Sequence, residues 1–205
     1  MMPEYWNKAT RELALKDPVL ERIINKNLSG MLTKSRDPFL TILHSIIGQQ
    51  LSIKAANSIE KKLKDLCELK PRSILKVTDI SLRECGLSNM KVQYFKDISL
   101  KDISLKVING ELNFNKINKL NDKEIIDRLT NIKGVGLWTA QMYLIFHLNR
   151  PNILPVGDAG LINSIKLSYN VKNVNFTKLK KIWSPWCTVA SWYLWRNIDN
   201  TDVSY

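Results

Sequence analysis

Apolar residues recur at intervals of three and four along most of this chain, and that spacing limits the fold more than any other feature. The stripes lie at 39–47, 55–66, 125–129 and 137–148, and Ser52 is the predicted N-cap of the helix that carries the second stripe. Residues three and four apart share a helix face, whereas a half-buried strand alternates with period two. No segment shows sustained alternation bounded by hairpin turns. The pattern therefore predicts an all-α protein.

Two proline-containing breaks divide the predicted helices. Pro38 opens one helix after Arg36 and Asp37, and residues 149–157 form a loop bracketed by prolines. These breaks predict a middle lobe over 36–150 and a second lobe built from both chain ends, 1–35 and 151–205. The expected architecture is a two-lobed helical bundle with the active-site cleft between the lobes. The repeat DISLK at 97–106 is interpreted as a helix that ends near Gly110, since glycine readily terminates helices.

The composition is that of a globular protein with a basic excess. Hydrophobic residues make up 44% and charged residues 24%, and 31 Lys+Arg against 19 Asp+Glu give a net charge of +12. Such an excess favours a polyanionic partner, with nucleic acid first and an anionic membrane or acidic protein next. AT-rich codon usage, which enriches lysine, is the alternative explanation.

The cysteines and histidines indicate neither a disulfide framework nor a metal centre. Three cysteines lie far apart and two histidines form no pair, which argues against a zinc finger and an iron–sulfur cluster. The chain shows no signal pattern and no apolar run of membrane-spanning length. We therefore expect a cytoplasmic protein, monomeric and without a cofactor.

The segment LTNIKGVGLWTA at 129–140 predicts a helix, a tight turn and a second helix. Glycines permit a sharp turn and close backbone approach, and the start of a helix at Gly136 offers amides and a positive dipole end to a phosphate. Such a hairpin holds DNA without reading its sequence. The alternative is an ordinary turn between packed helices, while a dinucleotide fold lacks its strand and third glycine. The predicted DNA-binding residues here are Lys133, Gly134, Val135, Gly136 and Thr139.

Downstream of the hairpin lies Pro155-Val156-Gly157-Asp158. A hairpin followed by a Gly/Pro loop and an Asp resembles the helix-hairpin-helix, Gly/Pro-rich loop, Asp superfamily of DNA glycosylases. Further blocks resemble its alkylation-repair branch, namely IIGQQLSIKAA at 46–56, CGLSNMK at 85–91, WSPW at 183–186 and ASWYLW at 190–195. The resemblance spans nearly the whole chain, 6–196, and matches the compact form without an N-terminal β domain.

The resemblance implies an enzyme that flips a damaged base out of double-stranded DNA and breaks its N-glycosidic bond. Asp158 is the predicted catalytic residue, because a carboxylate stabilises an oxocarbenium-like sugar and can orient or deprotonate water. It would also N-cap the helix that follows. Alkylated purines such as 3-methyladenine carry positive charge, on which aromatic rings stack. The predicted pocket residues, for which core packing is the alternative, are Trp138, Trp195, Tyr143 and Trp186.

Trp138 occupies the position at which strand-cutting branches of the family carry a Schiff-base lysine, so a monofunctional enzyme is expected. Cys187 replaces the arginine that usually follows Trp186 in the family, which leaves the substrate range open. A charge is thereby lost near Asp158, and Arg196 or Lys166 are candidates to replace it.

Two further sites follow from the resemblance. The loop that enters the gap left by the flipped base matches Gln49, Gln50, Leu51 and Ser52, with Gln50 the first candidate for the inserted wedge and Leu51 the second. A glutamine that bonds backbone at a helix end is the alternative. The family also implies a monovalent cation, sodium or potassium, on the backbone carbonyls of Thr130, Ile132 and Val135.

Two other functions remain open. One is a glycosylase for an oxidised, deaminated or mismatched base, which the missing lysine and cluster cysteines disfavour. The other is a non-catalytic hairpin module that only binds DNA. Asp158 separates the enzymes from the binding module.

Overall fold

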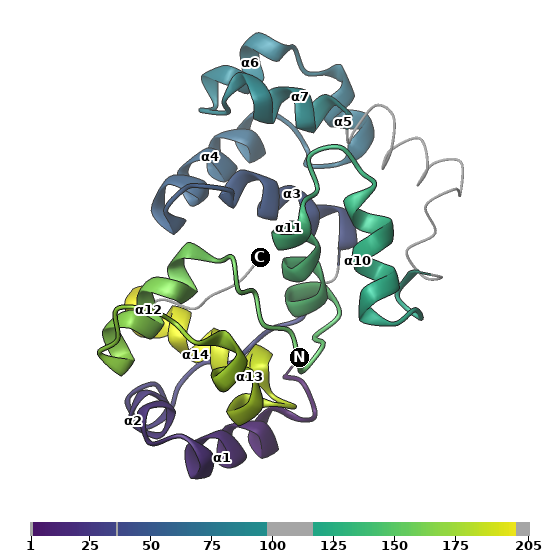
Figure 1. The fold of residues 1–205 in the computed structure, drawn as a ribbon. Helices are drawn as coiled ribbons and strands as arrows, with labels where there is room; N and C mark the ends of the chain where they lie inside the picture. Colours follow the sequence, from purple (N-terminus) through teal and green to yellow (C-terminus); the bar gives the residue numbers. More distant parts are fainter. Residues whose placement is uncertain (1, 36, 98–116, 200–205) are drawn as a thin grey trace. The chain divides into compact units, whose positions relative to one another are not determined.

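The computed structural model describes residues 2–35, 37–97 and 117–199, and this part of the chain contains helices and no strand (Figure 1). The all-α prediction is thereby confirmed. The chain divides into two compact units, which we call unit 1, Met1–Ser35 with Leu144–Ser204, and unit 2, Arg36–Tyr143. Within the described ranges, no helix combines the length and the apolar character that crossing a membrane requires.

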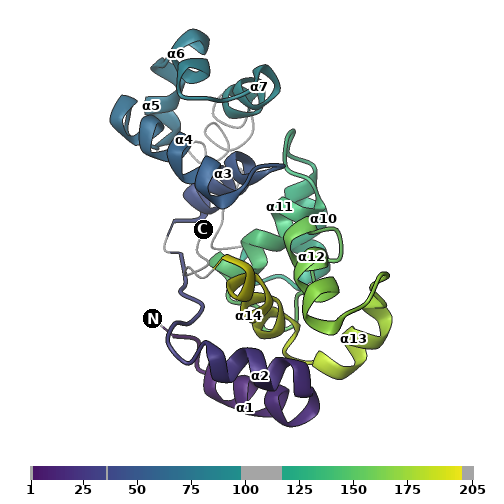
Figure 2. The same cartoon turned by 90° about the vertical axis from the view of Figure 1, so that its left-hand side faces the viewer.

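Unit 1 is built around a buried carboxylate, Asp17. Asp17 caps α2, where Oδ1 accepts the amides of Val19 and Leu20 at 3.0 and 3.2 Å. Its Oδ2 accepts the Tyr169 hydroxyl at 2.6 Å and Trp183 Nε1 at 2.9 Å. One carboxylate thus joins α2, α12 and α13, while α1 pairs with α2 and α12 packs on α14 (Figure 2). The helices of this unit are α1 (Trp6–Lys16), α2 (Pro18–Lys26), α12 (Ala159–Tyr169), α13 (Phe176–Trp183) and α14 (Cys187–Asp199).

The second boundary between the units falls between Tyr143 and Leu144, whereas the prolines had predicted it at 150/151. A π-helical turn, η2 (Tyr143–His147), crosses this point. Phe146 is buried, stacks on Trp195 with 6.0 Å between ring centroids, and accepts the Ser35 amide at 2.7 Å. These contacts assign the residues after Tyr143 to unit 1, so the prolines mark the end of a helical run and not the boundary.

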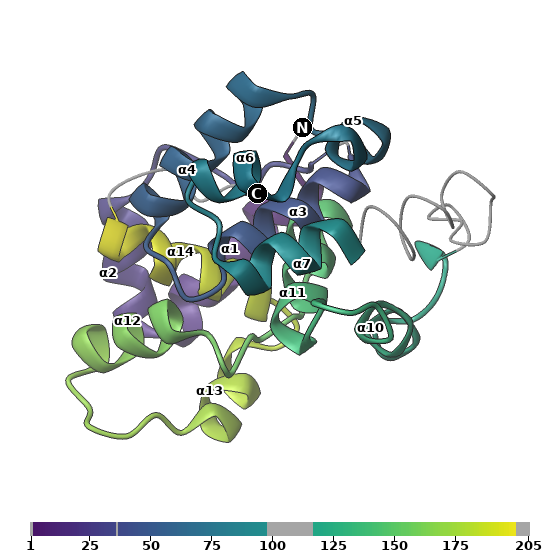
Figure 3. The same ribbon diagram turned by 90° about the horizontal axis from the view of Figure 1, so that it is seen from above.

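Unit 2 has the apolar helix α3 at its centre. Its buried side chains include Phe39, Leu43, Ile46 and Ile47, and α3 contacts α4, α7 and α11 (Figure 3). The predicted N-cap Ser52 is confirmed by its bond to the Ala55 amide. The helices are α3 (Pro38–Gly48), α4 (Ile53–Leu66), α5 (Pro71–Lys76), α6 (Asp79–Glu84), α7 (Asn89–Asp97), α10 (Asp122–Thr130) and α11 (Leu137–Met142).

Two members of the predicted apolar stripes are exposed. Leu66 is 41% exposed at the end of α4, and Leu137 is 53% exposed at the start of α11. Both are terminal residues of their helices and lie beyond the part of the helix face that is buried. The helix predicted after residue 97, ending near Gly110, lies outside the described residues.

A close His–Glu pair between α3 and α4 makes the stability of unit 2 dependent on pH. His44 Nε2 lies 3.2 Å from Glu60 Oε1, and Lys64 reaches the same oxygen. The hydrogen bond from His44, opposed by burial and aided by Lys64, lowers the pKa of Glu60 from 4.5 to about 2. A carboxyl with a lowered pKa stabilises the fold above pH 4.5, and that contribution is lost as the pH falls towards 2.

We therefore expect Glu60→Gln to lower the free energy of unfolding by about 1–3 kcal/mol at neutral pH, and to flatten its fall in acid. Urea unfolding at neutral and acidic pH measures both effects. Glu68→Gln is the matched control, because Glu68 pairs with Lys70 on an exposed surface and exposed pairs contribute little. Equal acid dependence of the two variants would contradict the assignment.

Candidate active site

Asp158 is the N-cap of α12, so the predicted capping role is confirmed. Its Oδ1 accepts the Leu161 amide at 2.6 Å and Trp195 Nε1 at 2.8 Å. Two donors from different helices on one oxygen fix the orientation of the carboxyl plane. A Cβ on Gly160 would lie 3.3 Å from the same oxygen, so the absent side chain leaves that edge of the carboxylate uncrowded.

The loop that leads to Asp158 is fastened to α14 at two points. Thr188 Oγ1 accepts the Ile153 amide at 3.0 Å and donates to the Arg150 carbonyl at 2.6 Å. Trp195 holds the far end of the loop through Asp158. Positions 188 and 195 are two turns apart and therefore share one face of α14. A single helix face thus sets where the carboxylate lies within unit 1.

The glycine hairpin forms in unit 2 between α10 and α11. Gly134 has a φ of +86°, and a Cβ there would lie 2.6 Å from Cγ of Tyr94, so position 134 requires glycine on two grounds. Gly136 is different: it is extended at φ −86°, and nothing lies within 4 Å of an added Cβ. Gly136 is the N-cap of α11 and has no side chain to accept a bond from the first-turn amides, so these amides are not capped by residue 136.

The other hairpin residues divide between surface and interior. Lys133 is exposed, and its Nζ lies 2.6 Å from Asp97 Oδ2 at the end of α7. Val135 and Ile132 are buried and anchor the turn. Thr139 as a whole residue is only 1% exposed, and its side chain bonds Gln49 at 2.9 Å.

The loop between α3 and α4 is joined to the hairpin by Gln49. Its Nε2 donates to the Gly134 carbonyl at 3.2 Å and to Thr139 Oγ1 at 2.9 Å. Gln49 therefore follows the alternative expected for a glutamine at a helix end. The next residue, Gln50, is exposed and has a φ of +58°, and Leu51 is 40% exposed. Gln50 and Leu51, followed by the cap Ser52, are the parts of this loop that reach outward.

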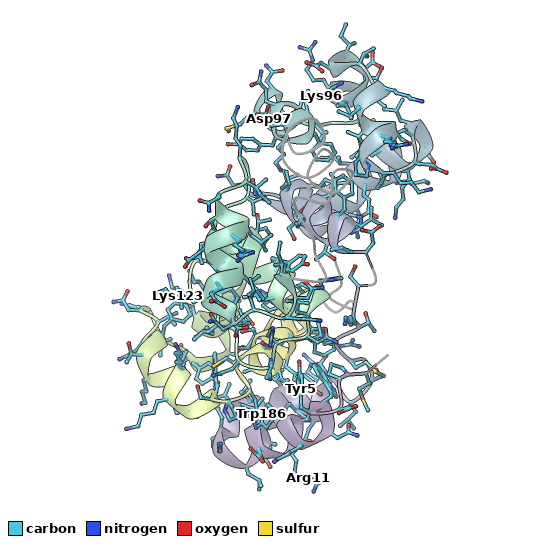
Figure 4. All side chains as sticks on the ribbon, turned by 90° about the vertical axis from the view of Figure 1, so that its right-hand side faces the viewer. Tyr5, Arg11, Lys96, Asp97, Lys123 and Trp186 are labelled. Atoms are coloured by element: carbon cyan, nitrogen blue, oxygen red, sulfur yellow. The ribbon has the colours of Figure 1, made fainter. Side chains whose placement is uncertain are left out.

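The four predicted pocket aromatics have different surroundings. Trp195, in unit 1, is only 6% exposed and bonds Asp158. Trp186 stacks on Tyr5 with 5.7 Å between centroids and donates to Glu12 at 2.7 Å (Figure 4). In unit 2, Trp138 is half-buried in the first turn of α11. Tyr143 is fully buried, and its hydroxyl donates to Asn118 at 2.8 Å.

Cys187 is buried at the first position of α14, with Sγ 3.8 Å from Ser184 Oγ. Burial raises the pKa of this thiol. It lies two turns before Trp195, about 12 Å along the helix axis. Arg196 lies over the Trp192 ring at 5.3 Å, and Lys166 is in the last turn of α12. The substitution thus changes the N-terminal end of α14, whereas the contact with Asp158 is made near its other end.

The hairpin carbonyls are compatible with a monovalent cation. The Ile132 carbonyl accepts the Val135 amide at 3.0 Å, which uses one of its two lone pairs. Thr130 ends α10, so its carbonyl is one that the helix cannot satisfy internally. In the described residues, no three His, Cys, Asp or Glu side chains are grouped to hold a metal ion, so a cation here would depend on backbone oxygens.

Comparison with known proteins identifies the family. Residues 43–186 match the model of the HhH-GPD superfamily of base excision DNA repair proteins. The chain belongs to this superfamily.

Individual relatives agree. DNA-3-methyladenine glycosylase 1 of Schizosaccharomyces pombe is 31% identical over 90% of this chain and 83% of its own length. The alkylbase DNA glycosidase-like protein mag2 of that organism is 33% identical over 93% of both. The structure of the S. pombe 3-methyladenine DNA glycosylase in complex with abasic DNA superposes with a TM-score of 0.82, at 28% identity, covering 97% of this chain and all of that one.

Sequence reasoning did not find three residues that hold these segments, namely Thr188, Tyr94 and Lys91. Each acts on a segment distant in the chain: Thr188 on 150–153, Tyr94 on Gly134, and Lys91 on 47–49. The block at 85–91, which contains Lys91 and resembles the family, is the one sequence signal for any of the three.

Proposed function

We propose that the protein is a monofunctional DNA glycosylase of base excision repair that flips alkylated purines out of double-stranded DNA and releases them by hydrolysis. The observation that carries the proposal is the fixed carboxylate of Asp158 at the start of α12, in a chain of the HhH-GPD superfamily. The names of the relatives, which print 3-methyladenine and alkylbase, support alkylated bases as the substrate class. We include 7-methylguanine because it is likewise a cationic alkylated purine. The product is an abasic site.

Asp158 is the proposed catalytic residue. The N-glycosidic bond breaks and its electron pair moves to the cationic base, which leaves as a neutral molecule. The positive charge that develops on the sugar is stabilised by the carboxylate. Water then bonds to C1′ and loses a proton, for which Asp158 is the proposed acceptor. Leu161 and Trp195, which hold Oδ1, keep the carboxylate from turning during these steps.

Aromatic side chains are the proposed selectors of the flipped base. Trp138 and Trp195 are the first candidates, because an electron-poor alkylated ring stacks favourably on indole. Tyr143 and Trp186 are weaker candidates, because their polar atoms bond Asn118 and Glu12, whereas Trp195 bonds Asp158 itself. Trp138 also supports monofunctional chemistry, since an indole cannot form the Schiff base by which lyases cut the strand.

The hairpin and the neighbouring loop are the proposed DNA contacts. First-turn amides of α11 and the side chain of Lys133 would bind phosphate. Gln50 and Leu51 would fill the gap left by the flipped base. A sodium or potassium ion on the carbonyls of Thr130, Ile132 and Val135 would add positive charge beside a phosphate. We propose that the enzyme is a monomer. We place it in the cytoplasm, and the three free thiols support a reducing compartment.

The substrate class is tested with duplexes of one sequence that carry 7-methylguanine, 8-oxoguanine or uracil at the same position. We expect release of 7-methylguanine and little or no release of the other two, because only the alkylated base is already a cationic leaving group. Chromatography of the free base measures the rate. Faster release of 8-oxoguanine or uracil would support a glycosylase for another base, and binding without any release would support the non-catalytic module.

A further inference from the structure

One face of α7 contacts both proposed DNA-binding segments of unit 2. Lys91, Tyr94 and Asp97 are spaced by three residues, so they lie along one side of the helix. Lys91 bonds the α3–α4 loop, the ring of Tyr94 lies under Gly134, and Asp97 pairs with Lys133. Since Gln49 also bonds the hairpin, the loop and the hairpin are joined to each other and to a common support.

Lys91 makes two of these attachments. Its Nζ donates to the carbonyls of Ile47 and Gln49, both at 2.7 Å. Carbonyls at the end of α3 have no partner within the helix, and a charged donor satisfies them better than a neutral one. The ammonium is half-buried, and this burial lowers the pKa of Lys91. Breaking the two bonds would therefore leave desolvated carbonyls and a desolvated charge without compensation.

Gln49 is consequently held from two sides. Lys91 holds its carbonyl, while its own side chain bonds the Gly134 carbonyl and Thr139. The next residue, Gln50, is exposed and adopts the left-handed conformation at φ +58°. A non-glycine residue persists there only where its surroundings determine the backbone. The fixed position of Gln49 supplies that constraint on one side of Gln50.

We propose that Lys91 is a positioning residue for base release, whose ammonium fixes the end of α3 so that Gln50 and Leu51 form a wedge before DNA arrives. This inference rests on the proposed function. It requires no contact between Lys91 and DNA. A preformed wedge matters because filling the gap competes with return of the flipped base, and misplacement of a positioning group by about 1 Å can reduce a rate about 100-fold.

The chain offers a matched control on the same helix. Lys96 Nζ also donates to a backbone carbonyl, that of Val77 after α5, and lies 3.6 Å from Asp79 (Figure 4). Lys96→Met thus removes the same kind of bond from α7 but leaves the α3–α4 loop attached. Lys91→Met removes the proposed support, and Lys91→Arg restores a cationic donor.

The test compares wild type and these three variants in single-turnover release of 7-methylguanine from a duplex, with 2-aminopurine beside the lesion to report flipping by fluorescence. For Lys91→Met we expect about 10- to 100-fold slower release and loss of the fluorescence rise, with affinity for undamaged duplex changed less than about threefold. Lys91→Arg should recover most of the rate. Lys96→Met should match wild type in release rate and in fluorescence, although its Tm should fall by about as much as that of Lys91→Met.

Three results would overturn the inference. The first is release of the base by Lys91→Met as fast as by wild type. The second is a loss of release rate in Lys96→Met as large as in Lys91→Met, which would indicate a general effect on unit 2. Affinity for undamaged duplex could also fall in parallel with the rate, which would make Lys91 a direct phosphate contact. If wild type itself releases no base, the proposed function fails and this inference with it, a result distinct from the other three.

Discussion

Asp158→Asn is expected to slow the single-turnover release of 7-methylguanine by about 100- to 1000-fold while the protein remains folded. The asparagine oxygen can accept the same bonds from the Leu161 amide and Trp195 Nε1 that Oδ1 accepts now, and asparagine is as good an N-cap as aspartate. What the variant loses is the negative charge beside the developing cation and the acceptor for the proton of water. Base release at saturating enzyme, with circular dichroism melting as the check of folding, measures the effect.

Asp37→Asn is the control for this prediction. Asp37 caps α3 and accepts the amides of Phe39 and Leu40 at 2.8 and 3.1 Å, so the same substitution is made at another cap. We expect its rate of release to stay within about threefold of wild type. If the two variants lose activity equally, or if Asp158→Asn stays active, Asp158 is a structural cap and not the catalytic group.

Gly134→Ala is expected to destabilise the protein by about 2–4 kcal/mol and to weaken DNA binding. The new methyl would lie 2.6 Å from the Tyr94 ring and would sit on a residue with φ +86°. The turn therefore has to move, and with it the Gly134 carbonyl that Gln49 bonds. Urea unfolding gives the stability, and fluorescence anisotropy with undamaged duplex gives the affinity.

Gly136→Ala separates the two effects of a hairpin glycine. Its backbone is extended and nothing lies within 4 Å of the added methyl, so the stability loss should be limited to the poorer N-cap, about 1 kcal/mol. DNA affinity should still fall, because the methyl stands where a phosphate would approach the first turn of α11. The account of the hairpin is wrong if Gly134→Ala is as stable as wild type, or if Gly136→Ala is the less stable of the two.

The sequence predicted features that depend on local spacing. The all-α class followed from apolar periodicity, and the caps Ser52 and Asp158 followed from their position before an apolar stripe. A helix, a turn and a helix around Gly134 and Gly136 could also be predicted, because the required glycine conformation is a property of the turn itself. These predictions needed no knowledge of what packs against each segment.

Features that depend on distant contacts could not be predicted in this way. The spacing could not show that Thr139 is buried against Gln49, or that Tyr143 is fully enclosed. It also placed the second unit boundary at the prolines, although Leu144 and the residues after it pack within unit 1. Lys91 illustrates the reason: a lysine in an amphipathic helix is expected in solvent, and only the fold brings two unpaired carbonyls to its ammonium.

The most direct test of the proposed function is an analysis of both products from a duplex that carries one 7-methylguanine. We expect free 7-methylguanine and an equal amount of full-length strand that breaks only after alkali, because hydrolysis of the N-glycosidic bond leaves the backbone unbroken. Absence of the free base, or a strand already cut before alkali, would contradict a monofunctional glycosylase in which water, deprotonated by Asp158, is the nucleophile.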